Sequence, residues 1–233
     1  MKWNINNQFS YPKSTRSLYN GSRHYMINGE RLPSVTNILQ LTKSSEDKKA
    51  LEKWKKENKD SEIILRESSS RGTLMHSYLS ETLMGRMNGE LIDEVNLPKK
   101  MAETIISNGL NDYVKDVYAS EECVYSLKYK YAGTMDALIS THKDKLQICD
   151  FKQKNSPAKR EYNSIRDYFT QILLYATAHN EIHGTNIQSG IILMCTPNLI
   201  FQKFEIEGQE FIDLQKEALK RVEKYYEIIN QNL

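Results

Sequence analysis

We expect this chain to adopt an α/β fold in which helices flank a mixed central β-sheet. The 233 residues are 39% hydrophobic, which is enough for one sizeable core. Stretches typical of strands gather in the middle of the sequence, and helical patterns precede and follow them. Because no internal repeat or low-complexity linker interrupts the chain, we expect one domain over residues 1–233. It would comprise an N-terminal hairpin and basic helical region, residues 1–66, and a core, residues 67–233.

The individual elements follow from local patterns along the chain. The Asn28-Gly29 dipeptide favours a tight turn and predicts a hairpin within residues 25–32. The spacing of apolar residues then predicts helices over residues 35–42, 46–59, part of 61–85, and 98–118. Three strands are predicted next, over residues 123–131, 132–141 and 146–152. The C-terminal part predicts a helix over 162–183 ended by Gly184, a buried strand over 188–195, a strand over 200–206 and an amphipathic helix over 209–230.

Two acids and a lysine stand on the last two strands of that central group, which form a predicted hairpin. Side chains of a strand alternate between its faces, so Asp150 and Lys152 project to one face, whereas Cys149 and Phe151 project to the other. Asp136 lies opposite Asp150 if the loop between the strands has an odd number of residues, or if one bulge intervenes. We expect that register.

Two carboxylates at cross-strand distance repel each other, and burying both without a partner is costly. A divalent cation between Asp136 and Asp150 would remove this cost. Oxygen ligands on a short hairpin suit Mg²⁺ or Mn²⁺, which polarise phosphoryl oxygens and acidify water. Lys152 would then orient the attacking water or neutralise charge on the phosphate. The alternative is a surface hairpin with solvated charges, because 27% of all residues are charged.

The segments around these residues resemble those of a known nuclease superfamily. Gly133-x-x-Asp136 and Asp150-Phe-Lys152 resemble the active-site hairpin of the PD-(D/E)XK nucleases, although Thr134-Met stands where the superfamily name expects a proline before the first acid. Other segments resemble, in order, motifs of its RecB-like branch: Arg71-Gly-Thr-Leu-Met-His76, Glu121 and Gln171-Ile-Leu-Leu-Tyr175. Within this branch the chain resembles the mitochondrial genome maintenance exonuclease and related phage exonucleases. The resemblance runs from about Pro33 to the C-terminal helix.

The resemblance implies a restriction-endonuclease-like core with an N-terminal helical arch that threads single strands. It implies a metal centre formed by His76, Asp136, Asp150 and the main-chain carbonyl of Phe151. The catalytic residues that it implies are Glu121, Asp136, Asp150, Lys152, Gln171 and Tyr175. Some RecB-like nucleases use four cysteines to hold an iron–sulfur cluster, but this chain has three, widely spaced, so we expect no such cluster.

Each supporting motif also has a purely structural interpretation. His76 falls in a predicted helix over residues 69–84, opened by a Ser or Thr cap and closed by a glycine, where it could be a core histidine. Gln171 and Tyr175 share a helix face, so they could be a half-buried tyrosine with a neighbouring amide. Glu121 stands beside a second glutamate, and such pairs are usually solvated; its functional alternative is an acid beside the metal or on a second metal.

Positive charge is concentrated near the N-terminus. Residues 1–60 hold 12 Lys and Arg against 6 Asp and Glu, although the net charge of the chain is only +2. Much of this excess lies on the predicted helix of residues 46–59, which could follow a phosphate backbone while Trp54 stacks on a base. The alternative is a solvated lysine face with Trp54 in the core. Together with the resemblance, this pattern gives the residues expected to contact nucleic acid: Ser34, Thr36, Lys53, Trp54 and Arg71.

These observations predict a Mg²⁺- or Mn²⁺-dependent exonuclease that hydrolyses DNA, with single strands that have free ends as substrate. The alternatives are a structure-specific or double-strand endonuclease on the same core, and a non-catalytic DNA-binding or recombination accessory module. We expect a monomer in the cytoplasm of a bacterial host, encoded by a phage or by that host. No apolar run approaches the roughly 18 residues that span a membrane, and the few cysteines favour a reducing compartment without disulfides.

Overall fold

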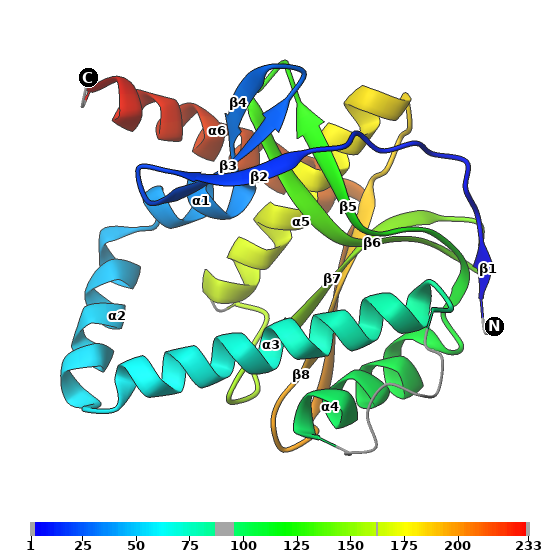
Figure 1. The fold of residues 1–233 in the computed structure, drawn as a ribbon, viewed down its shortest axis with the longest axis horizontal. Coiled ribbons are helices and arrows are strands. Elements are labelled where there is room, and N and C mark those ends of the chain that lie inside the picture. Colours follow the sequence, from blue (N-terminus) through cyan, green and yellow to red (C-terminus); the bar gives the residue numbers. More distant parts are fainter. Residues whose placement is uncertain (1–2, 87–95, 162, 232–233) are drawn as a thin grey trace.

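A mixed β-sheet forms the centre of the computed structural model, which describes residues 3–86, 96–161 and 163–231 (Figure 1). Within these residues the order of the six strands is β1-β5-β6-β7-β8-β9. Their bounds are Asn4–Ile5 for β1, Val114–Ser126 for β5, Tyr131–Thr141 for β6, Leu146–Gln153 for β7, Ser189–Cys195 for β8 and Phe201–Glu207 for β9. Strand β1 is parallel to β5 and β7 to β8, and the other pairs are antiparallel. The predicted mixed sheet is confirmed.

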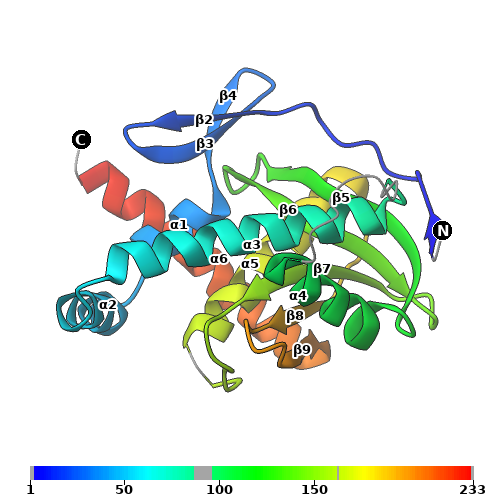
Figure 2. The same ribbon diagram turned by 60° about the horizontal axis from the view of Figure 1, so that its bottom comes forward.

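Helices cover both faces of this sheet (Figures 1 and 2). On one face lie α1 (Val35–Leu41), α5 (Asn163–His183) and α6 (Gly208–Gln231), and on the other α3 (Ser61–Leu83) and α4 (Leu97–Ile105). Each face has its own apolar cluster. Along β7, Ile148 belongs to the first cluster, and Cys149 and Phe151 to the second, so the predicted alternation of this strand is confirmed.

A small antiparallel sheet lies beside the large one. It consists of β2 (Thr15–Tyr19), β3 (Ser22–Ile27) and β4 (Glu30–Pro33). Asn28 and Gly29 both have positive φ, 49° and 83°, as a tight hairpin turn requires, which confirms the predicted hairpin. A similar turn at Asn20 and Gly21 joins β2 to β3. Every residue of β2 is exposed, so this strand lacks the alternation by which a strand is recognised in a sequence.

The predicted helix over residues 98–118 is wrong in its second half. Helix α4 ends at Ile105, a π-helical turn covers Ile106–Leu110, and β5 begins at Val114. Val114 and Val117 are both buried, and their spacing of three is typical of a helix. A register shift against β6 between Val114 and Asp116 produces that spacing in a strand, and a second shift follows between Val117 and Ala119. The strand predicted over residues 123–131 therefore begins at Val114 and ends at Ser126.

Helix α3 also begins earlier than the predicted helix over residues 69–84. It starts at Ser61, so the Ser and Thr residues near its middle are not caps, and that prediction is wrong. The helix does end before a glycine, as predicted: Gly85 has a φ of 64°, and the amide of Arg86 donates to the carbonyl of Glu81 at 2.9 Å. Residue 162, the predicted start of α5, lies outside the described residues.

The remaining predicted elements begin and end within about two residues of the observed ones. Helix α2 (Ser45–Glu57) packs differently from the other long helices, because none of its side chains is fully buried. Among the described residues, none of the helices is both long and apolar enough to cross a bilayer.

Candidate active site

The hairpin of β6 and β7 sets the two predicted acids opposite each other. Residues 142–145 lie between the two strands, but the amide of Thr141 donates to the carbonyl of Lys145 at 3.0 Å, so the loop closed by this hydrogen bond has three residues, 142–144. Ala137 pairs with Cys149, and the same register places Asp136 opposite Asp150. An odd-numbered loop therefore brings both side chains to one face, and the expected register is confirmed.

Asp136 and Asp150 lie at the point where β6 and β7 separate. Pairing between the strands ends at Ala137, while β7 continues beside β8 as far as Gln153. The backbone amide of Phe151 donates instead to Oδ2 of Asp136 at 2.7 Å. The Asp136 carboxylate thus replaces a main-chain carbonyl as the acceptor at the point where β6 and β7 separate, which we call the fork. Both acids are buried, with Asp136 7% and Asp150 0% exposed.

Lys152 forms a buried ion pair with Asp150. The Lys152 ammonium also lies 5.0 Å from the centre of the Tyr168 ring on α5. The ammonium contacts Oδ2 of Asp150, whereas Oδ1 has no hydrogen-bond partner among the described residues, so the ammonium compensates the charge but leaves one acceptor unsatisfied. Burial raises the pKa of Asp150, the Lys152 charge lowers it and the Asp136 charge raises it, with a result of about 7.

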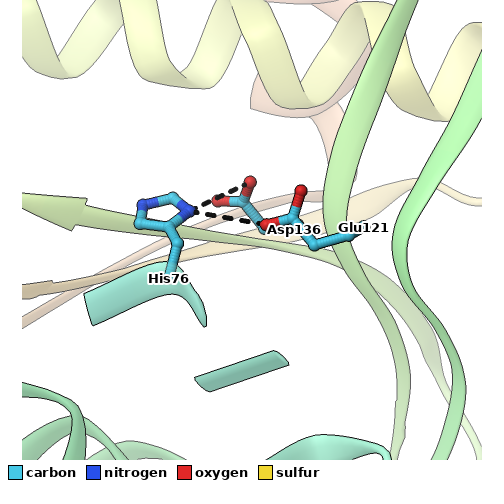
Figure 3. Close-up of side chains that lie close together, drawn as sticks. All are labelled: His76, Glu121 and Asp136. Atoms are coloured by element: carbon cyan, nitrogen blue, oxygen red, sulfur yellow. Dashed lines mark ion pairs between the residues drawn. The ribbon is translucent and has the colours of Figure 1, made fainter. Parts of the chain in front are cut away.

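His76 from α3 and Glu121 from β5 meet Asp136 at this fork (Figure 3). The Nδ1 atom of His76 lies 3.5 Å from Oδ1 of Asp136 and 3.8 Å from Oε1 of Glu121. Burial lowers the pKa of His76, but the Asp136 charge and hydrogen bonds to both acids raise it to about 10. Burial raises the pKa of Asp136, but the charges of His76 and Lys152 lower it to about 2. The acids thus favour a positive charge on His76, and the charges of His76 and Lys152 favour the ionised form of Asp136.

Potential metal-ligating atoms of His76, Glu121 and Asp136 all lie within 4.8 Å of one another. Asp150 lies one strand away on the same face, as its register shows. The fork is thus a candidate centre for a divalent cation.

Glu121 has an unusual backbone for a residue inside a strand, with a φ of 56°. A non-glycine residue in this left-handed region costs about 1 kcal/mol relative to an ordinary conformation. The conformation sets Glu121 opposite Asp136, and its carboxylate points toward the imidazole (Figure 3). Strain of this kind concentrates at functional sites, which favours a role for Glu121 beyond that of a solvated acid.

Replacing Glu121 by Asn is expected to weaken binding of Mn²⁺ about ten- to hundredfold without lowering thermal stability. Asparagine tolerates the left-handed region better than glutamate and removes the charge. Calorimetric titration with Mn²⁺ and a melting curve measure the two effects. Glu122→Gln, at the neighbouring position with an ordinary backbone, is the control and should bind Mn²⁺ normally. Equal affinities in the wild type and the Glu121 variant would contradict a role in metal binding.

Helix α5 brings Gln171 and Tyr175 to the same site. The amide of Gln171 donates to the hydroxyl of Tyr175 at 3.0 Å. The ring of Tyr175 packs on Gly133, where a Cβ atom would lie 2.5 Å from the ring carbon Cε1. Any larger residue would push this ring away, so the glycine of the Gly-x-x-Asp segment has a packing role that spacing alone does not reveal.

The fork opens into a cavity of about 990 Å³ between α3, the small sheet and the hairpin. The predicted site residues that line it are Ser34, Thr36, His76, Glu121, Asp136, Lys152, Gln171 and Tyr175. Asp150 and Phe151 lie buried beneath them. Ser34 also caps α1, because its Oγ accepts a hydrogen bond from the amide of Asn37 at 3.1 Å, and it lies 3.0 Å from Oγ1 of the exposed Thr36.

Three residues predicted to contact nucleic acid do not line this cavity. Lys53 is exposed on α2 and pairs with Glu57 on the same helix. Trp54 is half-buried, so it is not docked into the core as the alternative interpretation required. The guanidinium of Arg71 donates to side-chain oxygens of Gln153 and Asn155 and so ties α3 to the end of β7.

The cavity has further walls that sequence reasoning missed. Arg16, Arg23 and Tyr25 line it from the small sheet, and a row of serines and a threonine lines it from α3. The sequence indicated these walls only weakly. The Asn20-Gly21 dipeptide predicts a turn before Arg23, and the hydroxyl residues four apart predict a polar row along one side of a helix.

Comparison with known proteins gives one similar sequence of established name. The chain is 27% identical over 181 residues to mitochondrial genome maintenance exonuclease 1 from Xenopus tropicalis, covering 72% of this chain and 48% of that protein. The match therefore spans about half the length of this relative. No family model matches the chain.

Two solved structures show partial similarity to the chain. A candidate exonuclease from Eubacterium rectale has a TM-score of 0.47 at 14% identity, covering 70% of this chain and 69% of that chain. An alkaline exonuclease from Laribacter hongkongensis has a TM-score of 0.29 at 15% identity, covering 67% and 83%.

Proposed function

We propose that this chain is a divalent-metal-dependent nuclease that hydrolyses phosphodiester bonds in DNA, acting as an exonuclease on single strands with free ends. The observation that carries the proposal is the convergence of Asp136, Asp150 and Lys152 with His76 and Glu121 at one fork of the sheet. Similarity to a protein named as an exonuclease supports the reaction class. We further propose one nuclease domain that acts as a monomer in the cytoplasm of a bacterial host.

The donor set at the fork fits Mg²⁺ or Mn²⁺. Asp150 is a fully buried carboxylate whose Oδ2 contacts the Lys152 ammonium and whose Oδ1 has no hydrogen-bond donor among the described residues. Acceptors left in this state are costly, and a cation would satisfy them. Asp136, Glu121 and His76 offer further donor atoms close by, and the carbonyl of Phe151 is a fifth proposed ligand. A set of carboxylate oxygens with one imidazole binds hard ions such as Mg²⁺ and Mn²⁺ better than it binds soft metals.

When bound, the ion would polarise the scissile phosphate and acidify a water molecule. The side chains of the site would position the water and the phosphate. Lys152, held between Asp150 and the Tyr168 ring, is positioned to orient the attacking water or to neutralise charge on the phosphate. Gln171 and Tyr175 present an amide and a hydroxyl from the opposite wall, where they can bind phosphate oxygens. His76 must release its proton before it can bind a metal.

The test is a time course on end-labelled linear and circular single-stranded DNA with Mg²⁺, Mn²⁺ or EDTA. We expect the linear strand to be shortened from an end in either metal, the circle to remain intact, and EDTA to prevent cleavage. Cleavage of the circle would replace the exonuclease with an endonuclease on the same core. If no metal-dependent product formed from any nucleic acid, the chain would be a non-catalytic binding module.

A further inference from the structure

Two arginines with free guanidinium groups face the cavity from the small sheet. Arg16 lies opposite Tyr25, and Arg23 lies opposite Leu18. Directly opposite residues of antiparallel strands share a face, so both arginines project from the face of Tyr25, and all three line the cavity. The hydroxyl of Tyr25 lies 3.1 Å from Oγ1 of Thr134, two residues from the first acid of the fork. Among the described residues, neither guanidinium has an ion-pair or hydrogen-bond partner.

The opposite wall is a face of α3 that carries hydroxyl groups. Ser69, Thr73 and Ser77 are exposed, line the cavity and are spaced four residues apart. Residues with this spacing form a row along one side of a helix. The lining continues from Leu65 to Glu81, about 24 Å of helix at a rise of 1.5 Å per residue, and it passes the histidine of the candidate metal centre.

Charge indicates what this space could hold. At the fork the cavity is lined by the acids Glu121 and Asp136, with Asp150 buried beneath, and by His76 and Lys152, which face these acids. A strand of nucleic acid carries a negative charge at every phosphate, so it needs cations on the protein away from the metal. Guanidinium groups match phosphate oxygens in pairs, and hydroxyl groups donate to them without adding charge. Arg16 and Arg23 supply the first kind of contact, and the α3 row supplies the second.

We propose that the small sheet and α3 form the two walls of a track that binds the sugar–phosphate backbone of a single strand leading to the metal centre. Arg16 and Arg23 are its principal phosphate-binding residues. This assignment rests on the proposed nuclease function and adds to it the surface that holds the substrate strand beside the scissile bond.

The first test measures binding without turnover. Fluorescence anisotropy of a labelled oligothymidylate in EDTA compares the wild type with Arg16→Ala/Arg23→Ala at several salt concentrations. We expect the double variant to bind about ten- to hundredfold more weakly at low salt. The slope of log K against log salt should fall by about 1.4, because each phosphate contact on a single strand contributes about 0.7. Both side chains are exposed, so the melting temperature should not change.

Arg31→Ala is the matched control. Arg31 pairs with Met26 on the small sheet and therefore projects from the opposite face, where its guanidinium lies 3.9 Å from the centre of the Tyr19 ring. Its removal subtracts half of the charge that the double variant loses from the same sheet, yet the slope should stay at the wild-type value. A fall of the slope by about 0.7, half that of the double variant, would mean that net charge alone drives binding, and it would overturn the track.

The second test separates this track from the chemistry. With Mn²⁺, the double variant should raise KM for the oligonucleotide at least about tenfold, with kcat within about threefold. Hydrolysis of bis(p-nitrophenyl) phosphate, too small to reach both the centre and the arginines, should be unchanged. If the wild type cleaves neither substrate, the nuclease proposal fails. The salt dependence of oligothymidylate binding then still shows whether Arg16 and Arg23 bind the strand. If the wild type cleaves DNA and the double variant keeps its KM and slope, the track is wrong and the nuclease stands.

The α3 wall has its own test. Thr73→Asp places a negative charge in the hydroxyl row and should weaken oligothymidylate binding at least about tenfold. Ser70→Asp adds the same charge to an exposed position of the same helix that does not line the cavity, and it should bind almost normally. Equal binding by these two variants would remove α3 from the track.

Discussion

Replacing Asp150 by Asn is expected to abolish metal-dependent cleavage while the protein stays folded. The substitution keeps the size of the side chain but removes a buried charge that, by our proposal, binds the metal. Losing such a ligand removes several kcal/mol of transition-state stabilisation, so kcat/KM should fall at least about 10³-fold. Single-turnover cleavage of end-labelled DNA measures the loss, and a melting curve in EDTA measures the fold.

Asp144→Asn is the matched control for this prediction. Asp144 lies in the loop of the same hairpin, is exposed and pairs with Lys115. Its φ of 55° suits asparagine as well as aspartate, so the substitution should leave both cleavage and melting temperature near the wild-type values. A fully active Asp150→Asn protein would end the proposal of a metal centre at the fork.

The hairpin that carries the acids could be predicted because its register depends on local parity. A loop of three residues leaves only one way to align Asp136 with Asp150, and the alternation of apolar residues along β7 selects the face. Strand β5 could not be predicted in the same way. The register shift after Val114 places two buried valines, Val114 and Val117, three residues apart, and only pairing with β6 decides between strand and helix.

The rest of the site depends on contacts that sequence spacing does not encode. Nothing in a pair of glutamates predicts that Glu121 takes a left-handed conformation and points to His76. The lysines of α2 formed the most conspicuous charge pattern, yet a charge run does not reveal which way a helix faces. Arg16 and Arg23 are only two charges, on the neighbouring strands β2 and β3, but the fold of the small sheet makes both line the cavity.

Replacing Lys152 by Met should abolish cleavage as completely as Asp150→Asn, but with a stability defect that depends on pH. The ammonium is the charge partner of a fully buried carboxylate. Burial raises the pKa of Asp150 and Lys152 opposes that rise, so without the lysine the pKa should rise further, above about 7. A carboxyl group whose folded pKa exceeds its unfolded value is stabilising at low pH, and this contribution is lost as pH rises through the folded pKa.

The free energy of unfolding of Lys152→Met should therefore lie near that of the wild type at pH 5 and fall below it at pH 8. The fall should reach at most about 1.4 kcal/mol, because pH 8 lies about one unit above the wild-type pKa of about 7 and one pKa unit corresponds to about 1.4 kcal/mol. Denaturant unfolding in EDTA at the two pH values measures the difference. Adding Asp150→Asn to Lys152→Met replaces the unpaired carboxylate by a neutral amide, so stability at pH 8 should recover while cleavage stays absent. Lys154→Met, two residues along the strand, should keep cleavage within a few-fold of the wild type. A deficit independent of pH, or one that the double variant fails to repair, would mean that Lys152 supports the fold by packing rather than as the charge partner of Asp150.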